Sequence, residues 1–121
     1  MVTNAMPGFR DDDIKKALDY VGITPNYKGF PMLTLAIALA AEDNRRMYNL
    51  RDGIYDPIAC SMSCSVSSVG RNIRTAIRVS WKFDPTKLFE IFGTADVLDR
   101  APNNARFIAR MVRFVGERSK Q

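Results

Sequence analysis

Residues 54–81 read IYDPIACSMSCSVSSVGRNIRTAIRVSW, and this segment is the most informative part of the chain. Leu50, Ile54 and Ile58 recur every four residues, which predicts a helix over about 50–62. Because Pro57 lacks an N–H, we expect a kink or break near Asp56-Pro57. A serine-rich turn at 63–65 leads to a second helix over about 66–82. Two helices joined by a short turn are typical of a helix-turn-helix, whose second helix enters the DNA major groove.

The second helix has two faces when its residues are placed at 100° steps. The apolar face carries Val66, Val69, Ile73, Ala76, Ile77 and Ser80. The polar face carries Ser67, Ser68, Arg71, Arg74, Thr75 and Arg78. The apolar face must pack against a core, and that packing directs the polar face toward solvent. Ser65 or Ser67 is expected to cap the start of this helix.

The polar face has the chemistry of a DNA-reading surface. Arg71 is near the N-terminal part of the helix, which enters the groove deepest, and an arginine can donate to O6 and N7 of guanine at once. Arg74 and Arg78 follow one and two turns later and are expected to contact phosphates. Ser67 and Ser68 are expected to bind a phosphate or a base. A solvated arginine face is the alternative interpretation.

Composition limits the function classes. The 121 residues fit one domain, 46% hydrophobic content fits a folded chain, and the net charge of +5 suggests a polyanionic partner, nucleic acid first. The chain has no histidine and no phosphate-binding glycine motif, so we expect no enzyme activity, no cofactor and no small-molecule substrate. Zinc needs about four ligands, so Cys60 and Cys64 do not predict a metal site.

The expected location is the cytoplasm. The two cysteines form no disulfide framework, and no signal peptide is visible. The longest apolar run, 31–41, is too short to span a bilayer, so no membrane partner is expected. Double-stranded DNA is the expected partner, and the sequence leaves open whether the chain acts as a homodimer or as tandem copies on DNA.

The rest of the chain predicts an all-α fold of about six helices. Residues 1–10 are expected to be a flexible N-terminus, and 11–121 a single helical domain. Asp11 to Asp13 should form the N-cap and first turn of a helix that Gly22 ends. A long central helix is predicted over 29–48, and a short one from Asp84-Pro85 to Gly93. After a loop over 94–102, Asn103 or Asn104 should cap a last helix with a basic polar face at Arg106, Arg110, Arg113 and Arg118.

Several motifs resemble the C-terminal effector domain of the stage-zero sporulation protein A family, response regulators of spore-forming Firmicutes. They are VGITPNYKGF at 21–30, YxxIA at 55–59, VxRxIRxAIxVxW at 69–81, Phe92-Gly93, and PxNxxFIA at 102–109. The resemblance implies an all-helical fold that binds a short DNA box, often as tandem head-to-tail copies. By matching position, Arg71 resembles the principal base-reading arginine, Arg74 a DNA contact one turn later, and Ser67 a serine at the helix start.

The chain departs from the family pattern at several positions. Ser68 replaces a usual arginine, Gly70 a base-reading glutamate, and Thr75 a frequent histidine. The order of Asp56 and Pro57 is reversed. The loop before Pro102 is one residue shorter, and Arg100 is the nearest basic replacement for a family lysine that contacts DNA. The family also places a receiver domain ahead of this domain, and we expect this chain to lack one.

Two hypotheses about function follow. The first is a sequence-specific DNA-binding transcription regulator with a recognition helix over about 66–82. The second is a protein-interaction module that keeps the fold but binds a receiver, a sigma factor or a homologous regulator. The departures at Ser68, Gly70 and Thr75 make the second hypothesis credible, and in it the arginines of the last helix would face an acidic protein surface or a neighbouring protomer on DNA.

Overall fold

The described residues fold into six α-helices, confirming the all-α prediction. A computed structural model describes residues 9–93 and 100–119 and contains no strand within those ranges. The helices are α1 (Asp11–Tyr20), α2 (Gly29–Glu42), α3 (Asp56–Met62), α4 (Val66–Phe83), α5 (Pro85–Phe92) and α6 (Asn104–Ser119). A 3₁₀ helix, η1 (Asn44–Tyr48), and a π-helix, η2 (Arg51–Tyr55), lie between α2 and α3.

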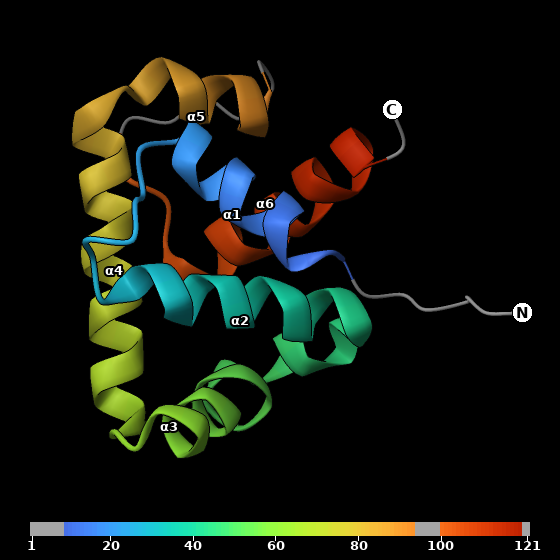
Figure 1. Cartoon of the computed structure of the whole chain (residues 1–121), viewed down its shortest axis with the longest axis vertical. Coiled ribbons are helices and arrows are strands. Elements are labelled where there is room, and N and C mark those ends of the chain that lie inside the picture. Colours follow the sequence, from blue (N-terminus) through green and yellow to red (C-terminus); the bar gives the residue numbers. More distant parts are fainter. Residues whose placement is uncertain (1–8, 94–99, 120–121) are drawn as a thin grey trace, which may run out of the picture.

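Helix α2 is the centre of the fold. It crosses the middle of the long helix α4, with α1 and α6 on one side of it and η1, η2 and α3 on the other (Figure 1). Its buried residues are Gly29, Phe30, Met32, Leu33, Thr34, Ala36, Ile37 and Ala40. A helix that is apolar on most sides must be surrounded by other elements, so the prediction of a central core helix is confirmed for this part.

The predicted helix over 29–48 is wrong in its second half, because α2 ends at Glu42. Asp43 has an extended backbone, with φ −153° and ψ 98°. Its carboxylate accepts hydrogen bonds from the backbone N–H of Arg45 at 3.1 Å and from Arg45 Nε at 2.9 Å. These hydrogen bonds lower the pKa of Asp43 below its ordinary value. An aspartate that binds nearby backbone competes with helix continuation, and here it starts η1 instead.

At Asp56-Pro57, where a kink or break was predicted, the structure has a change of helix type and no break in the helical backbone. The π-helix η2 ends at Tyr55, and the α-helix α3 begins at the next residue, Asp56. The backbone is helical at both residues. Pro57 cannot donate to the carbonyl oxygen of Gly53, four residues earlier, and Arg46 Nη1 donates to that oxygen at 2.8 Å. A Cβ at Gly53 would lie 2.3 Å from the carbonyl oxygen of Arg46, so the two backbones meet only because residue 53 is glycine.

The ends of α1 and α5 agree with most of the predicted caps and helix stops. Asp11 to Asp13 occupy the first turn of α1, as predicted, but the N-cap is Arg10, which makes no side-chain cap. The carboxylate of Asp84 accepts from the N–H of Thr86 at 3.0 Å and caps α5, and the hydrogen bond from the Thr86 hydroxyl lowers the pKa of Asp84. Gly22 and Gly93 end α1 and α5 with φ of 89° and 83°, as predicted.

Two predicted segments are only partly described. Within the flexible N-terminus predicted over 1–10, Phe9 packs against the core, and residues 1–8 lie outside the described ranges. Within the loop predicted over 94–102, residues 94–99 also lie outside them.

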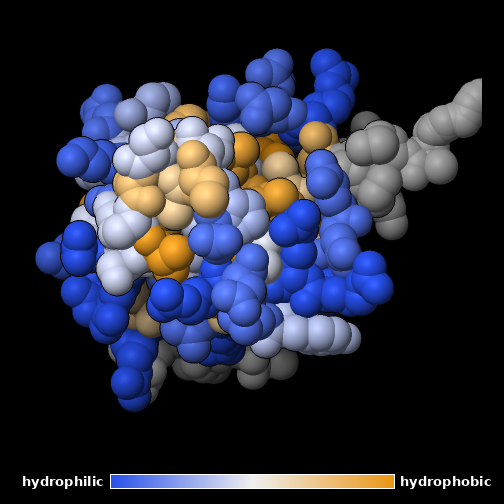
Figure 2. All heavy atoms as spheres, turned by 90° about the horizontal axis from the view of Figure 1, so that it is seen from below, coloured by the Kyte–Doolittle hydropathy of each residue, from blue (hydrophilic) through white to orange (hydrophobic). Residues whose placement is uncertain are grey.

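The surface is mainly hydrophilic where α3 closes one end of the molecule. Viewed from that end, hydrophobic residues show in separate places between hydrophilic ones (Figure 2). The buried apolar side chains form one core to which every α-helix contributes, including Ile14, Leu33, Ile58, Ile73, Leu88 and Phe107. The core therefore joins α4 to the rest of the chain along the whole length of its buried face.

Candidate nucleic-acid interface

Helix α4 is anchored by the face that the sequence predicts. Val69, Ile73, Ala76, Ile77 and Ser80 are buried, and Val66 is half-buried. Since these side chains lie against α2, α3 and α6, the helix cannot rotate about its axis without exposing them. The opposite face is directed outward, and Arg71, Arg74, Thr75 and Arg78 on it are exposed.

The turn before α4 brings its first residues to the surface in a fixed conformation. Ser63 adopts the left-handed conformation with φ 54°, which ends α3. Ser65 Oγ then accepts a hydrogen bond from the backbone N–H of Ser68 at 3.0 Å. Of the two predicted caps, Ser65 is the one confirmed. The remaining N–H groups of the first turn are available to an acceptor outside the chain.

Replacing Ser65 with alanine is expected to lower the free energy of unfolding by about 1 kcal/mol, because the N–H of Ser68 loses its acceptor. Urea unfolding followed by circular dichroism measures the change. Ser61→Ala is the matched control, since Ser61 is exposed on α3 and makes no hydrogen bond within the described residues. An equal effect of the two substitutions would show that the cap contributes nothing.

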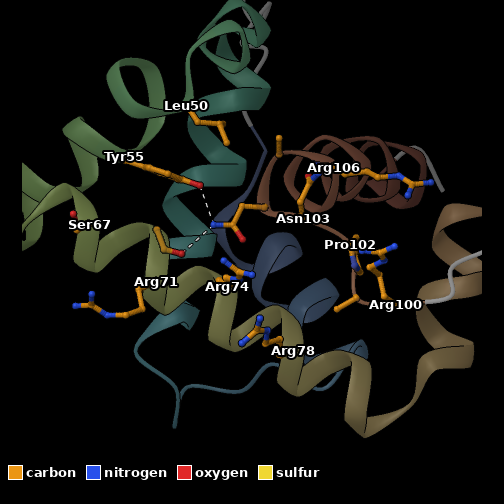
Figure 3. A pocket seen from close by; sticks show the side chains of 14 residues that line it. Leu50, Tyr55, Ser67, Arg71, Arg74, Arg78, Arg100, Pro102, Asn103 and Arg106 are labelled. Atoms are coloured by element: carbon orange, nitrogen blue, oxygen red, sulfur yellow. Dashed lines mark hydrogen bonds between the residues drawn. The ribbon is translucent and has the colours of Figure 1, made fainter.

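An open groove of about 1260 Å³ runs between α4 and the start of α6. Its lining consists of Leu50, Tyr55, Ser67, Gly70, Arg71, Arg74, Arg78, Arg100, Ala101, Pro102, Asn103, Asn104, Ala105 and Arg106. Three arginines project from α4, while Arg100 and Arg106 lie on the side formed by the segment that enters α6 (Figure 3). Among the described residues, five arginines and no carboxylate line the groove, a charge distribution that favours a polyanion.

Five of the seven residues predicted to contact DNA line this groove: Ser67, Arg71, Arg74, Arg78 and Arg100. Thr75 is exposed outside it. Ser68 also lies outside the groove and is half-buried. Its carbonyl oxygen and its Oγ both accept hydrogen bonds from Asn72 Nδ2, at 2.9 and 3.2 Å. Ser68 is therefore held by its own helix.

The arginines of α4 are not held by the protein. Within residues 9–93 and 100–119, Arg71, Arg74 and Arg78 make no hydrogen bond or ion pair. On the other side, the guanidinium carbon of Arg106 lies 5.2 Å from the centre of the Phe92 ring, a cation–π distance. The α4 arginines therefore keep all their donors for a partner outside the chain.

Apart from Arg100, the residues that close the groove opposite α4 were not predicted from the sequence. Asn103 is confirmed as the cap of α6, with Oδ1 accepting from the N–H of Arg106 at 2.8 Å, but its place in the groove was not predicted. Tyr55, Asn104 and Arg106 were not predicted to line the same groove as Arg74 either. Residues 55 and 104 are 49 positions apart, so no helical period could have paired them.

No helix in the described part of the chain is long and apolar enough to cross a membrane. Among the same residues, no group of three or more cysteine and carboxylate side chains could hold a metal ion. Cys60 and Cys64 are both free thiols.

Most of the chain matches a known protein family. Residues 14–115 match the family described as Sporulation initiation factor Spo0A C terminal. The matched range contains α2 to α5 entirely and every residue that lines the groove. The family consists of DNA-binding effector domains of sporulation response regulators. The resemblance seen in the sequence is confirmed, and the chain belongs to the Spo0A C-terminal family of DNA-binding effector domains.

Proposed function

We propose that the chain is a sequence-specific transcription regulator that places α4 in the major groove of DNA. The observation that carries this proposal is the combination of a buried apolar face and three exposed, unpartnered arginines on one 18-residue helix. A helix can enter the major groove only if its outer face is free of other protein segments. Arg71, Arg74 and Arg78 are exposed on this face within the described part of the chain, which supports the proposal.

Each residue has a role in this proposal. Arg71, in the second turn of α4, reads a base, with guanine as the best chemical match. Arg74 and Arg78 lie further along the groove and bind phosphates as the helix rises out of the DNA. Ser67 donates to a phosphate near the helix start, and Arg100 binds the backbone on the far side of the groove. Thr75 and Ser68 are supporting contacts at the edge of this surface.

The proposal is tested by selecting binding sites from a random DNA pool. The affinity of the protein for the selected duplex and for a random duplex is then measured by fluorescence-anisotropy titration. We expect an enriched sequence that binds at least tenfold more tightly than random DNA at about 0.15 M salt. Equal affinity for both duplexes would exclude sequence-specific regulation. Absence of binding even at low salt would favour the protein-interaction module instead.

Replacing Arg78 with alanine is expected to weaken selected and random DNA alike and to reduce the slope of log K against log salt by about one, since one phosphate contact is lost. The measurement is the same titration repeated over a range of salt concentrations. Arg113→Ala is the matched control, because Arg113 is an exposed arginine outside the groove, 3.5 Å from Glu117. If both variants change the slope equally, net charge and not the groove position controls binding.

A further inference from the structure

One side chain joins the two sides of the groove. Asn104, the first residue of α6, donates from Nδ2 to Tyr55 Oη at 2.9 Å and to the carbonyl oxygen of Gly70 at 3.0 Å (Figure 3). Tyr55 belongs to η2 and Gly70 to α4. We name this arrangement of Tyr55, Asn104 and Gly70 the amide bridge. It connects three elements at the turn of α4 that contains Arg71.

The tyrosine ring is in close contact with the same turn of α4. A Cβ added at Gly70 would lie 3.3 Å from Tyr55 Cε2 and 3.8 Å from Cδ2 and Cζ. A larger residue at position 70 would therefore have to move the ring or the helix. The glycine allows the ring to contact α4 from one side while the amide holds the Gly70 carbonyl.

The hydrogen bonds fix the orientation of the Asn104 amide. Exchanging Oδ1 and Nδ2 would place two acceptor oxygens, that of Asn104 and that of Gly70, against each other. Both N–H groups of Nδ2 are used within the protein, so Asn104 has no donor left for the bidentate contact that asparagine makes with adenine. Its chemistry is that of a residue that positions a reader and does not itself read a base.

The position of α4 matters more for a base contact than for a phosphate contact. A bidentate pair between arginine and guanine requires two aligned hydrogen bonds, which a small displacement breaks. The attraction between a guanidinium group and a phosphate varies slowly with distance. A shift of this turn of α4 would therefore lower affinity for a specific sequence and leave affinity for random DNA nearly unchanged.

We propose that Asn104 is a positioning residue that, through the amide bridge, sets where the Arg71 turn of α4 stands relative to α6 and thereby sets sequence preference. This inference rests on the proposed function, because it requires a base read by α4. The bridge also accounts for Gly70, which has no side chain to offer DNA but is the point at which α4 is held.

The test uses Tyr55→Phe, which keeps the ring and removes the acceptor, and Asn104→Ala, which removes the amide. Tyr20→Phe is the matched control, since it removes a hydroxyl that donates to Glu90 Oε2 at 2.6 Å outside the groove. For each variant of the full chain, affinity is measured for the selected duplex and for random DNA. We expect Tyr55→Phe and Asn104→Ala to reduce the ratio of the two affinities by about threefold to tenfold. Tyr20→Phe should leave the ratio unchanged.

Two further readouts separate positioning from a general loss of structure. The variant that carries both Tyr55→Phe and Asn104→Ala should show no larger fall in the ratio of the two affinities than Asn104→Ala alone, because both substitutions remove the same hydrogen bond. In the free protein, the NMR signals of the Asn104 side-chain amide should move in Tyr55→Phe and stay in place in Tyr20→Phe.

The outcomes discriminate between this inference and the proposed function. If the wild type prefers a selected sequence and both bridge variants keep the full preference, or lose affinity for both duplexes equally, the positioning role is overturned and the regulator remains. Unmoved amide signals in Tyr55→Phe also overturn it. A wild type that shows no sequence preference overturns the proposed function, and the positioning role with it.

Discussion

Replacing Arg71 with alanine is expected to cost about 1–3 kcal/mol of binding free energy on the selected duplex and to relax preference at one base pair. Arg71 is exposed and makes no hydrogen bond or ion pair within the described residues, so its removal leaves no protein group unsatisfied. The loss therefore reports a contact with DNA. The measurement is anisotropy titration against four duplexes that differ only at the base pair that Arg71 reads.

Arg71→Lys is the matched control for charge. It keeps the positive charge but replaces the planar fork by a single ammonium group, so affinity for random DNA should persist while preference at that base pair falls. Losses of equal size on selected and random DNA in Arg71→Ala would assign Arg71 to phosphate binding and remove the base-reading role.

Much of the fold could be predicted because α4 and its turn obey local rules. The 3.6-residue period separated Val69, Ile73 and Ile77 from the arginines, and the structure buries the first set and exposes the second. Ser65, Asp84 and Asn103 were among the caps that the sequence predicted. Such caps are predictable because each accepts a hydrogen bond from a residue within three positions of its own.

The errors arise where a short-range preference competes with a longer pattern. Residues 29–48 contain enough helix-forming residues to predict one helix, but the Asp43 carboxylate binds Arg45 and ends α2. A helical period contains no information about that competition. In η2, the carbonyl of Gly53 is satisfied by Arg46, seven residues earlier, which likewise no period predicts.

Only half of the groove could be predicted. The side formed by α4 follows from one helix, but the opposite side forms when the start of α6 and η2 meet α4 in three dimensions. Gly70 illustrates the difference. In the sequence, Gly70 replaces a base-reading glutamate of the family pattern, and a glycine in a helix is about 1 kcal/mol less stable than an alanine. In the structure it is the place where Tyr55 and Asn104 contact the helix.

The position of α4 also depends on its crossing with α2, which passes through Gly29. A Cβ at Gly29 would lie 2.5 Å from the carbonyl oxygen of Asn72 and 2.7 Å from the Cβ of Ala76, both in α4. Gly29 is buried, and it is the first residue of α2. The two helices can approach this closely only because position 29 has no side chain, and neither contact atom belongs to a flexible side chain that could move away.

Replacing Gly29 with alanine is therefore expected to lower the free energy of unfolding by about 3 kcal/mol, the upper end of the usual cost of overpacking. Urea unfolding followed by the fluorescence of Trp81, the single tryptophan, measures the change. Gly116→Ala makes the same substitution inside α6, where the new Cβ would lie 3.5 Å from Phe9 Cζ, an ordinary contact. That control should gain about 0.5–1 kcal/mol from helix propensity. If Gly29→Ala proved as stable as Gly116→Ala, α2 and α4 could not cross at the separation described, and the helix that carries Arg71 would have to be supported in another way.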